Sequence, residues 1–366
     1  MSYLLTFVIS FLISMAMLPL ILKVSHARGW YDQTGGRKIH KGNVPRLGGV
    51  GIAIAFFATL VIIYASYNPL GKLPNPGLNF WLLLAMGAGI HVLGLADDFI
   101  DLSGRFKFAV QIVIAILIIC LGFSFKVIAL PFVPFEIRLG VLGIPITFFW
   151  IMGILNAINL IDGMDGLAGG MVFISCATWA VLFYMQTEYL PAIVATAAAG
   201  SIFGFLFFNF PPASIFMGDS GSLFLGFVLA ILPLLGSGRF EGDTGLLQAI
   251  TICLIPISDT LAAILRRWQL GVSFFTADRY HIHHKLLNIG LNTRQSLAVI
   301  YALAMLSGAS ALSTLYLKPM ISSIVMLATW VFFLVFFLVM HYFKKNKFRL
   351  PRRSRAGDAF DEGQGE

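Results

Sequence analysis

The chain has 366 residues, of which 58% are hydrophobic and only 11% are charged, and its formal net charge is +8. A soluble globular domain carries about 25% charged residues, so this composition excludes a soluble domain. A disordered chain and a nucleic-acid-binding domain are excluded as well, because the basic residues lie in loops between apolar segments. The three cysteines, Cys120, Cys176 and Cys253, each lie within an apolar run, which predicts packing roles and no disulfide scaffold.

Eleven apolar segments follow one another along the chain, and most approach the roughly 20 residues that a helix needs to cross a membrane. We expect helices at residues 2–22, 47–67, 80–96, 106–125, 144–161, 167–185, 189–208, 223–235, 246–265, 296–317 and 320–342. The first segment lacks a preceding basic residue and is too long for a signal peptide, so we interpret it as a retained helix. The sequence therefore predicts an all-α, polytopic integral membrane protein with about 11 transmembrane helices.

The eighth segment is short enough to be re-entrant, and the charges of the loops decide its interpretation. If it crosses, the loops 23–46, 97–107 and 266–295 and the C-terminal tail lie on one side and carry 20 of the 25 Lys and Arg residues. The positive-inside rule favours this arrangement, with the N-terminus outside and the C-terminus cytoplasmic. We expect residues 1–343 to form a transmembrane catalytic domain and residues 344–366 to form a basic, then acidic, disordered tail.

Polar residues gather at the helix ends that this topology places on the cytoplasmic side. Four clusters stand out, at residues 97–107, 156–166, 209–222 and 274–285. A single acid at a helix end is most often a cap, but three acidic clusters on one face indicate a common site. Asn156, Asn159 and Asp162 recur every three residues and would form one stripe on a helix. That stripe is expected to face a protein-lined cleft, because exposure to lipid would be costly.

The residue types in these clusters indicate magnesium-dependent phosphate chemistry. Crowded carboxylates need a cation, and oxygen ligands without cysteine suit Mg²⁺, which combines one or two protein oxygens with substrate phosphates and water. Two prolines and two glycines between residues 211 and 221 predict a broken backbone around Asp219, with amide groups exposed to phosphate. Together with Arg105 and Lys107, this pattern predicts a diphosphate site where a soluble donor meets a lipid acceptor, and hence phosphoryl transfer.

At these residues the sequence resembles the polyprenyl-phosphate N-acetylhexosamine-1-phosphate transferase family. The resemblance rests on the following elements, in chain order: residues 37–49, Asp97-Asp98, residues 156–166, residues 216–221 and residues 281–284. It covers about residues 1–345 and leaves out only the tail. The four motifs that follow residues 37–49 occur in the family's order, and this order makes the resemblance specific.

The resemblance implies roles for the residues at matching positions. Asp219 would be the main Mg²⁺ ligand and the side chain of Asn159 a second one, and Mn²⁺ is expected to substitute. Asp97 would act as a base toward the lipid phosphate, with Asp98 as its partner near the metal. A covalent aspartyl-phosphate route stays open beside direct attack by the lipid phosphate.

The family's histidine loop, with His281, His283 and His284, would lie over the sugar and diphosphate as part of the catalytic machinery. The remaining implied substrate-binding residues are Lys41, Arg105, Lys107, Asn156, Asp162, Asp165, Asn209, Phe216, Gly218 and Arg279.

Ile282 interrupts the histidine run, whereas the family branches that use a muramoyl-pentapeptide donor resemble one another in three consecutive histidines. The pattern resembles the N-acetylglucosamine-1-phosphate (WecA-like) branch. It implies transfer from UDP-N-acetylglucosamine to undecaprenyl phosphate, giving undecaprenyl-diphospho-N-acetylglucosamine and UMP, the first membrane step of a cell-envelope polysaccharide. UDP-muramoyl-pentapeptide or another UDP-N-acetylhexosamine is the alternative donor. The resemblance further implies a bacterial cytoplasmic (inner) membrane, a site facing the cytoplasm, contacts with membrane lipids and, as one option, a homodimer.

Two interpretations from other classes compete. Residues 97–101 fit the DDxxD pattern of intramembrane prenyltransferases, but the expected second carboxylate-rich repeat is missing. A transporter would place its ionisable residues near mid-span, whereas these acids cluster at one surface. Within the spans, we interpret Asp259 as a structural partner of Arg266, with a role in orienting the histidine loop as the alternative, and His91 as a packing residue.

Overall fold

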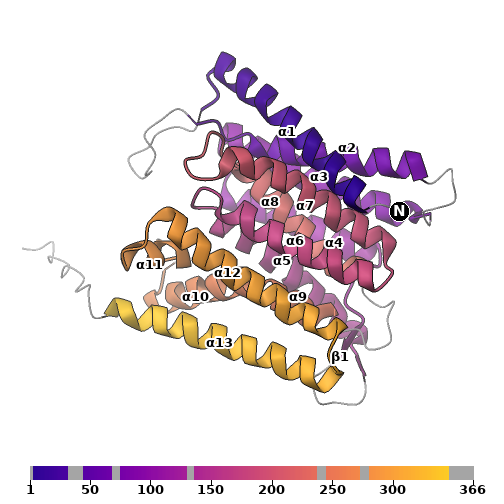
Figure 1. The fold of residues 1–366 in the computed structure, drawn as a ribbon, viewed down its shortest axis with the longest axis vertical. Coiled ribbons are helices and arrows are strands. Elements are labelled where there is room, and N and C mark those ends of the chain that lie inside the picture. The colour runs from indigo at the N-terminus through magenta and orange to yellow at the C-terminus, as the bar shows by residue number, and fades with distance from the viewer. Residues whose placement is uncertain are drawn as a thin grey trace, which may run out of the picture.

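The computed structural model describes residues 3–31, 44–67, 75–129, 136–236, 245–272 and 280–345, with side chains up to residue 340. Long helices dominate these residues (Figure 1). The helices are α1 (Tyr3–Arg28), α2 (Gly48–Tyr67), α3 (Gly77–Ile100), α4 (Gly104–Cys120), α5 (Gly143–Ile161), α6 (Leu167–Met185), α7 (Tyr189–Asn209), α8 (Gly218–Gly236), α9 (Gly245–Ile252), α10 (Leu254–Leu270), α11 (Ile282–Asn288), α12 (Thr293–Leu312) and α13 (Pro319–Lys345). Single 3₁₀ turns occupy Gly140–Leu142 and Ser313–Leu315.

The all-α prediction is confirmed for the described residues, with one small addition. Strands β1 (Val127–Ala129) and β2 (Glu136–Arg138) form an antiparallel hairpin between α4 and α5. Each strand has only three residues, and no alternating pattern in so short a segment could have predicted it.

Nine described helices are long and apolar enough to cross a membrane, namely α1, α2, α3, α5, α6, α7, α8, α12 and α13. The bent pair α9 and α10 forms a tenth candidate, and α4 has an apolar sequence but only 17 residues. These elements coincide with the eleven predicted segments. The prediction of one continuous helix over 246–265 is wrong, because the path bends by 73° between α9 and α10.

Helix α8 lies at the centre of the bundle, and 94% of its most apolar window is buried. The helix begins at Gly218, five residues before the predicted start, so its 19 residues are enough for a crossing. Small residues allow neighbours to approach it closely. A side chain at Gly94 of α3 would collide with the backbone of Asp219, and one at Gly49 of α2 would collide with Gly221. Helices α2 and α3 therefore both converge on the first turn of α8.

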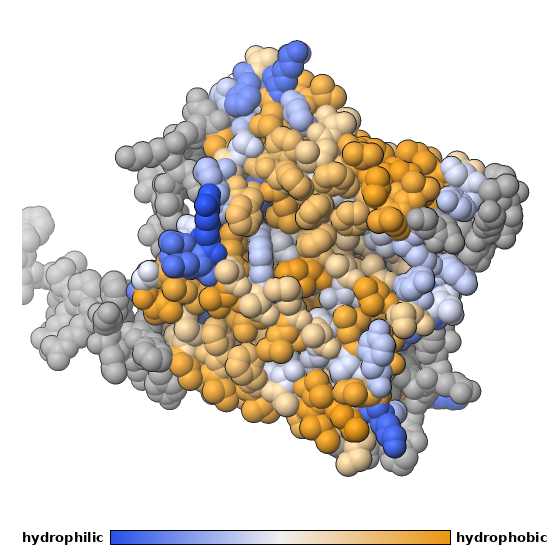
Figure 2. All heavy atoms as spheres, viewed as in Figure 1, coloured by the Kyte–Doolittle hydropathy of each residue, from blue (hydrophilic) through white to orange (hydrophobic). Residues whose placement is uncertain are grey.

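The two ends of the bundle carry different elements (Figure 1). The start of α1 and strand β1 lie at one end, and α11 and the end of α13 lie at the other. Figure 2 shows a face covered mainly by hydrophobic residues, with strongly hydrophilic ones toward its margins. Large exposed side chains on α10 and α13, such as Leu265, Trp268 and Leu334, are what a lipid-facing surface requires.

Candidate active site

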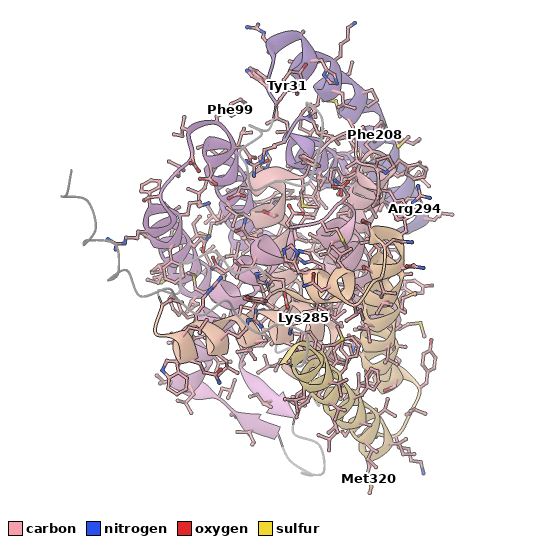
Figure 3. All side chains as sticks on the ribbon, turned by 90° about the vertical axis from the view of Figure 1, so that its left-hand side faces the viewer. Tyr31, Phe99, Phe208, Lys285, Arg294 and Met320 are labelled. Carbon is pink, nitrogen blue, oxygen red and sulfur yellow. The ribbon has the colours of Figure 1, made fainter. Side chains whose placement is uncertain are left out.

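The predicted polar clusters meet at the end of the bundle that carries α11 (Figure 3). Seen from this end, the labelled residues Phe99, Phe208, Lys285 and Arg294 surround the middle of the face. They belong to the ends of α3 and α7, to α11 and to the start of α12. Segments far apart in the sequence therefore contribute to one surface.

Asp98 joins the end of α3 to the start of α8. The backbone N–H of Asp219 donates to Asp98 Oδ1 (2.7 Å), and that of Ser220 donates to Asp98 Oδ2 (3.0 Å). Gly218 has a φ of +72° and leaves room for this carboxylate, since a Cβ there would lie 2.6 Å from Asp98 Oδ2. A negative charge at a helix N-terminus is also favoured by the helix dipole. Asp98 thus fixes the turn that carries Asp219.

This arrangement confirms one part of a prediction and corrects another. The backbone does leave the helical path between Asn209 and Gly218, as the prolines and glycines indicated. The amide groups of Asp219 and Ser220, however, are bound by Asp98 and do not face an open phosphate site. The sequence could not reveal this, because Asp98 lies 121 residues before Asp219.

Lys107 of α4 bridges two carboxylates. Its Nζ atom lies 2.7 Å from Asp97 Oδ2 and 2.8 Å from Asp219 Oδ2. Asp97 Oδ1 accepts the backbone N–H of Leu102 at 2.7 Å, so both oxygens of Asp97 have partners. The Asp97 side chain is 8% exposed, compared with 20% for Asp219. Of these two carboxylates, Asp219 is the more accessible to a ligand.

The stripe on α5 faces protein, as its spacing predicts. Asn156 Nδ2 donates to Gln111 Oε1 of α4 (2.9 Å) and to the carbonyl of Met152 (2.8 Å). One turn further on, Asn159 Nδ2 donates to Ser222 Oγ of α8 (2.9 Å). Ser222 in turn lies one turn after Asp219. The amide oxygen of Asn159 therefore belongs to the same wall of the site as Asp219.

Asp162 follows the last turn of α5 and is half-buried. Burial, followed by the negative charges of Asp219, Asp98 and Asp165, raises the pKa of Asp162 to about 7, against the opposing effect of Arg46. Four carboxylates therefore share one electrostatic environment.

Arg46 is a site residue that the analysis of motifs had not selected. Its segment is held against residues 216–217 by three backbone hydrogen bonds, from Phe216 N to Pro45 O (2.8 Å), from Gly48 N to Phe216 O (2.9 Å) and from Gly49 N to Met217 O (2.9 Å). A basic residue two positions before the pair of glycines that begins α2 was the available signal. Phe216, which the resemblance assigned to substrate binding, is half-buried in this pairing.

Asp165 and Asn209 connect the two loops that follow α5 and α7. Asn209 is 5% exposed; its Oδ1 accepts the N–H of Gly166 (2.8 Å) and its Nδ2 donates to Ile215 O (2.8 Å). Asp165 Oδ2 accepts the N–H of Ala213 at 3.1 Å. The substrate contacts predicted for both residues stay predictions. Their hydrogen bonds show that they shape the loops beside Asp162.

The histidine segment forms the start of α11 and is not the loop that we expected. His281 Nδ1 lies 2.7 Å from Asp259 Oδ2, and the backbone N–H of Ile282 donates to Asp259 Oδ1 (2.8 Å). For Asp259 the structure thus supports the alternative interpretation, a role in orienting the histidines, whereas the guanidinium of Arg266 lies over the ring of Tyr280 at 6.0 Å.

His283 occupies the middle of this segment. Its ring lies parallel to that of His281, with centroids 6.1 Å apart, and its centroid is 4.2 Å from that of His284. It packs against Gly163, where a Cβ would lie 3.0 Å from Nε2. Neither ring nitrogen has a hydrogen-bond partner, and burial, followed by the charge of His284, lowers the pKa of His283 to about 3.

Three predicted substrate-binding residues make no contact with this cluster that the described residues show. Arg105 is exposed on the first turn of α4 and makes no ion pair with the described carboxylates. Lys41 and Arg279 lie outside the described residues. The same holds for most of residues 344–366, whose predicted disorder is not tested.

The donor set suits a cation that needs few protein ligands. Among the residues that the structure describes, no three His, Cys, Asp or Glu side chains converge as a metal-binding group. Asp219 and the amide oxygen of Asn159 nevertheless offer two hard oxygen donors, a number that Mg²⁺ accepts when substrate phosphates and water complete its shell. The ammonium of Lys107 between Asp97 and Asp219 shows that positive charge is favoured at this position.

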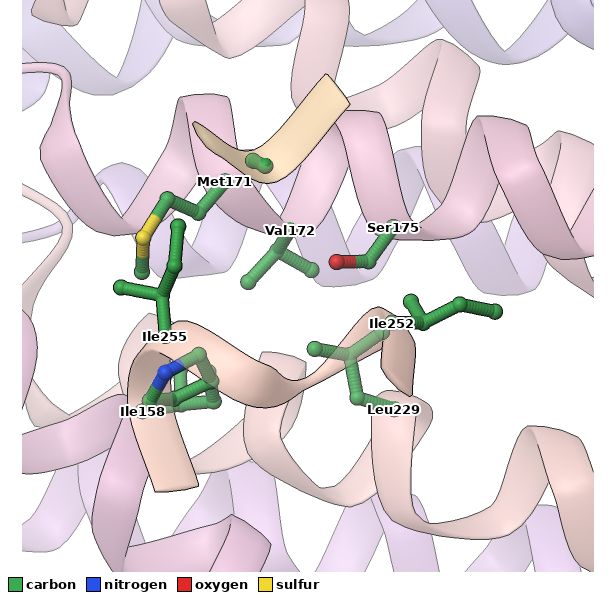
Figure 4. A pocket seen from close by; sticks show the side chains of 9 residues that line it. Ile158, Met171, Val172, Ser175, Leu229, Ile252 and Ile255 are labelled. Carbon is green, nitrogen blue, oxygen red and sulfur yellow. The ribbon is translucent and has the colours of Figure 1, made fainter. Parts of the chain in front are cut away.

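A separate small cavity lies deeper in the bundle, beside the break between α9 and α10 (Figure 4). Its lining residues are Ile158, Met171, Val172, Ser175, Leu229, Ile252, Ile255, Pro256 and Ala304. Only Ser175 among them is polar, and none is a predicted site residue. The cavity therefore has no part in the chemistry proposed for the polar cluster.

Comparisons with known proteins agree with the motifs. The model of glycosyl transferase family 4 matches residues 80–237. The "Probable undecaprenyl-phosphate N-acetylglucosaminyl 1-phosphate transferase" of Bacillus subtilis (strain 168) is 37% identical over 84% of this chain and 83% of its own length. The "Decaprenyl-phosphate N-acetylglucosaminephosphotransferase" of Mycobacterium leprae (strain TN) is 32% identical over 80% and 78% of the respective chains. The "Undecaprenyl-phosphate alpha-N-acetylglucosaminyl 1-phosphate transferase" of Yersinia pestis is 30% identical over 79% and 78%.

These matches cover both the acidic clusters and the membrane helices around them. At this identity and coverage, and with the motif residues brought to one end of the bundle, the chain belongs to glycosyl transferase family 4.

Proposed function

We propose that this enzyme transfers N-acetylglucosamine 1-phosphate from UDP-N-acetylglucosamine to undecaprenyl phosphate and releases UMP. The observation that carries the proposal is the likeness to the Bacillus subtilis protein, whose name states both the acceptor and the transferred group. The UDP donor follows from the resemblance of the motifs. The Mycobacterium leprae relative is named for a decaprenyl phosphate, so the chain length of the acceptor differs among the relatives.

Asp219 and Asn159 would hold Mg²⁺, with Mn²⁺ as a substitute, at the mouth of the polar cluster. When bound, the cation neutralises the diphosphate and so favours attack by an anion. The chain's own contribution is positional: Asp98 fixes the helix turn that carries Asp219, and Ser222 orients the amide of Asn159. The half-buried ammonium of Lys107 lies within reach of the same place and supplies a second positive charge.

In the proposed reaction, an oxygen of the lipid phosphate forms a bond to the β-phosphorus of the donor. The bond between that phosphorus and the bridging oxygen breaks, and UMP leaves with the electron pair. A phosphate monoester has a second pKa of about 6, so the acceptor is already largely dianionic at neutral pH. Both oxygens of Asp97 are bonded, to Leu102 N–H and Lys107. We therefore assign Asp97 to holding Lys107 and not to proton removal.

We place the site on the cytoplasmic side of a bacterial inner membrane. The loops at the end that carries α11, together with the tail, hold 20 of the 25 Lys and Arg residues, which supports a cytoplasmic position under the positive-inside rule. A soluble nucleotide sugar could reach that side directly. Reaction of a membrane-impermeant thiol reagent with a cysteine introduced at the exposed Arg105, in inside-out but not right-side-out vesicles, would test this placement.

The central test is UMP release by the detergent-purified protein. We expect release to require UDP-N-acetylglucosamine, undecaprenyl phosphate and Mg²⁺ together, and to fall by at least about 10³-fold in Asp219→Ala, as expected when a metal ligand is lost. Glu188→Gln is the matched carboxylate control, because Glu188 lies at the start of α7, at the far end from Asn209. Faster turnover of UDP-muramoyl-pentapeptide than of UDP-N-acetylglucosamine would contradict the assigned donor.

Direct and covalent routes differ in a single turnover without lipid acceptor. Direct attack predicts no UMP under these conditions, whereas an aspartyl-phosphate intermediate predicts one UMP per enzyme molecule. The hydrogen bonds of Asp97 and Asp98 leave neither carboxylate unoccupied, which favours direct attack.

A further inference from the structure

Asp259 is a buried carboxylate, 2% exposed, on the second turn of α10. Its two oxygens have different partners, since Oδ1 accepts the N–H of Ile282 (2.8 Å) and Oδ2 lies 2.7 Å from His281 Nδ1. Ile282 is the first residue of α11, and the side chain of its N-cap residue, His281, makes no capping hydrogen bond. Asp259 therefore supplies the cap that α11 lacks and contacts the adjacent imidazole with the same group.

The contact with Asp259 decides which ring nitrogen of His281 carries the proton. An ionised carboxylate only accepts hydrogen bonds, so Nδ1 must be the donor. Nε2 is left as the nitrogen that can meet a ligand, and no described residue bonds to it. When the ring carries a second proton, Nε2 is a donor as well and can form a hydrogen bond to a phosphate oxygen.

The position of the histidines joins this pair to the acidic cluster. His281 lies parallel to His283, and His283 packs against Gly163, the residue after Asp162. The elements packed here carry further charged or titratable groups, namely Asp162, Arg266, Arg267, His283, His284 and Lys285. Of the described residues, only Asp259 is seen bonded to the ring of His281.

We propose that Asp259 is a positioning residue for the transfer reaction: it keeps a proton on Nδ1 of His281, so that Nε2 is the nitrogen that meets the donor's diphosphate, to which it donates when the ring carries two protons. This inference rests on the proposed function, because the diphosphate is the anion that His281 would meet. Asp259 itself does not touch substrate. Because it lies on α10 and also caps α11, it couples the position of the histidine segment to α10.

Asp259→Asn separates the two tasks of the carboxylate. The amide oxygen can still accept the N–H of Ile282, while the NH₂ group faces Nδ1 and drives the proton to Nε2 of a neutral ring. We expect the cap to survive, the neutral ring of His281 to change from the Nδ1–H to the Nε2–H tautomer, and kcat/KM for UMP release to fall by about 10-fold or more. Asp259→Glu keeps the carboxylate and should restore the Nδ1–H tautomer and part of kcat/KM.

The tautomer is identified by ¹⁵N NMR of the histidine side chains in the full-length protein without substrate, with the signal of His281 assigned by its loss in His281→Gln. Thr314→Val is the structural control, because it removes another contact between helical segments, the half-buried 2.8 Å hydrogen bond from Gln248, and should leave the tautomer of His281 unchanged. In the His281→Gln background, Asp259→Asn should change kcat/KM by less than about twofold.

The outcomes are separable. An unchanged His281 tautomer in Asp259→Asn, or an equal loss of kcat/KM with and without His281, would overturn the positioning role. A wild-type protein that releases no UMP from any of the named donors would overturn the proposed function, and the NMR measurement would still decide whether Asp259 controls the protonation of His281.

Discussion

Asp98 and Asp259 solve the same structural problem in two regions of the site and differ in what else they do. Each carboxylate reaches from one helix to the N-terminus of another, Asp98 from α3 to α8 and Asp259 from α10 to α11. Both oxygens of Asp98 bind backbone amides, whereas Asp259 divides its oxygens between one amide and one imidazole. Asp98 thus acts only as a clamp between two helices, whereas Asp259 is a clamp that also determines which ring nitrogen of His281 carries the proton.

The difference teaches how the two regions should respond to substitution. The acidic region depends on backbone placement, because Asp219 is useful only if the first turn of α8 stays where Asp98 holds it. The histidine region depends on protonation as well as placement. A carboxamide can replace a carboxylate where one partner can change its tautomer, but not where both partners are fixed N–H donors.

Among the substitutions that compare the two clamps, Asp98→Ala should have the largest effect. The substitution leaves the N–H groups of Asp219 and Ser220 without acceptors, at a cost of about 1–3 kcal/mol for each group that stays buried. The turn that carries Asp219 should move, and a displacement of about 1 Å can reduce a rate by about 10²-fold. We expect a lower unfolding temperature and a comparable loss of UMP release. Unchanged stability together with full activity would show that the clamp is dispensable.

A smaller effect should distinguish the two clamps directly. In Asp98→Asn, the single amide oxygen faces two backbone N–H donors, those of Asp219 and Ser220, so the NH₂ group must face an N–H. In Asp259→Asn, the NH₂ group faces the imidazole of His281, whose Nδ1 can accept a hydrogen bond. We therefore expect Asp98→Asn to be the more destabilising by about 1 kcal/mol. Parallel thermal unfolding in the same detergent measures this. Equal destabilisation would remove the distinction between the two carboxylates.

The smallest effect concerns Asp162, which lies between the two regions. Its folded pKa of about 7 exceeds the unfolded value of about 3.9, so the folded state binds more protons between these values and stability falls as pH rises from about 4 to 7. Asp162→Asn should reduce this fall in the free energy of unfolding by about 1 kcal/mol over the same pH range, after allowance for solvent screening. Unfolding of both proteins at pH 5 and pH 7 measures the difference, and identical slopes would contradict it.

The sequence predicted most of the fold because membrane-spanning helices can be recognised by their apolar composition. All eleven apolar segments are helical in the described residues, and the three-residue spacing of Asn156, Asn159 and Asp162 placed them correctly toward protein. The bend between α9 and α10 was not predictable, because the run 246–265 is mostly apolar with Asp259 as its only charged residue, and Pro256 lies beyond the break.

The sequence predicted which residues belong to the site, but not which of them contact one another. Motif positions indicated Asp98, Asp219 and the histidines, but partners separated by 121 or 22 residues leave no local pattern. Arg46 was missed because a single arginine in a basic loop resembles a topology signal. Asp259 was noticed, yet sequence spacing favoured Arg266 on the same helix over a partner on the next one.

The central position of α8 has a consequence for how the protein is made. The partners of its first turn, Asp98 and Lys107, precede it in the chain, as do α2, α3 and α5, which pack around it. A nascent chain that has emerged only as far as Gly236 already contains every contact described for Asp219. The histidine segment needs α10 and α11, which are synthesised afterwards. During biosynthesis, the acidic half of the site can therefore form before the histidine segment has been synthesised.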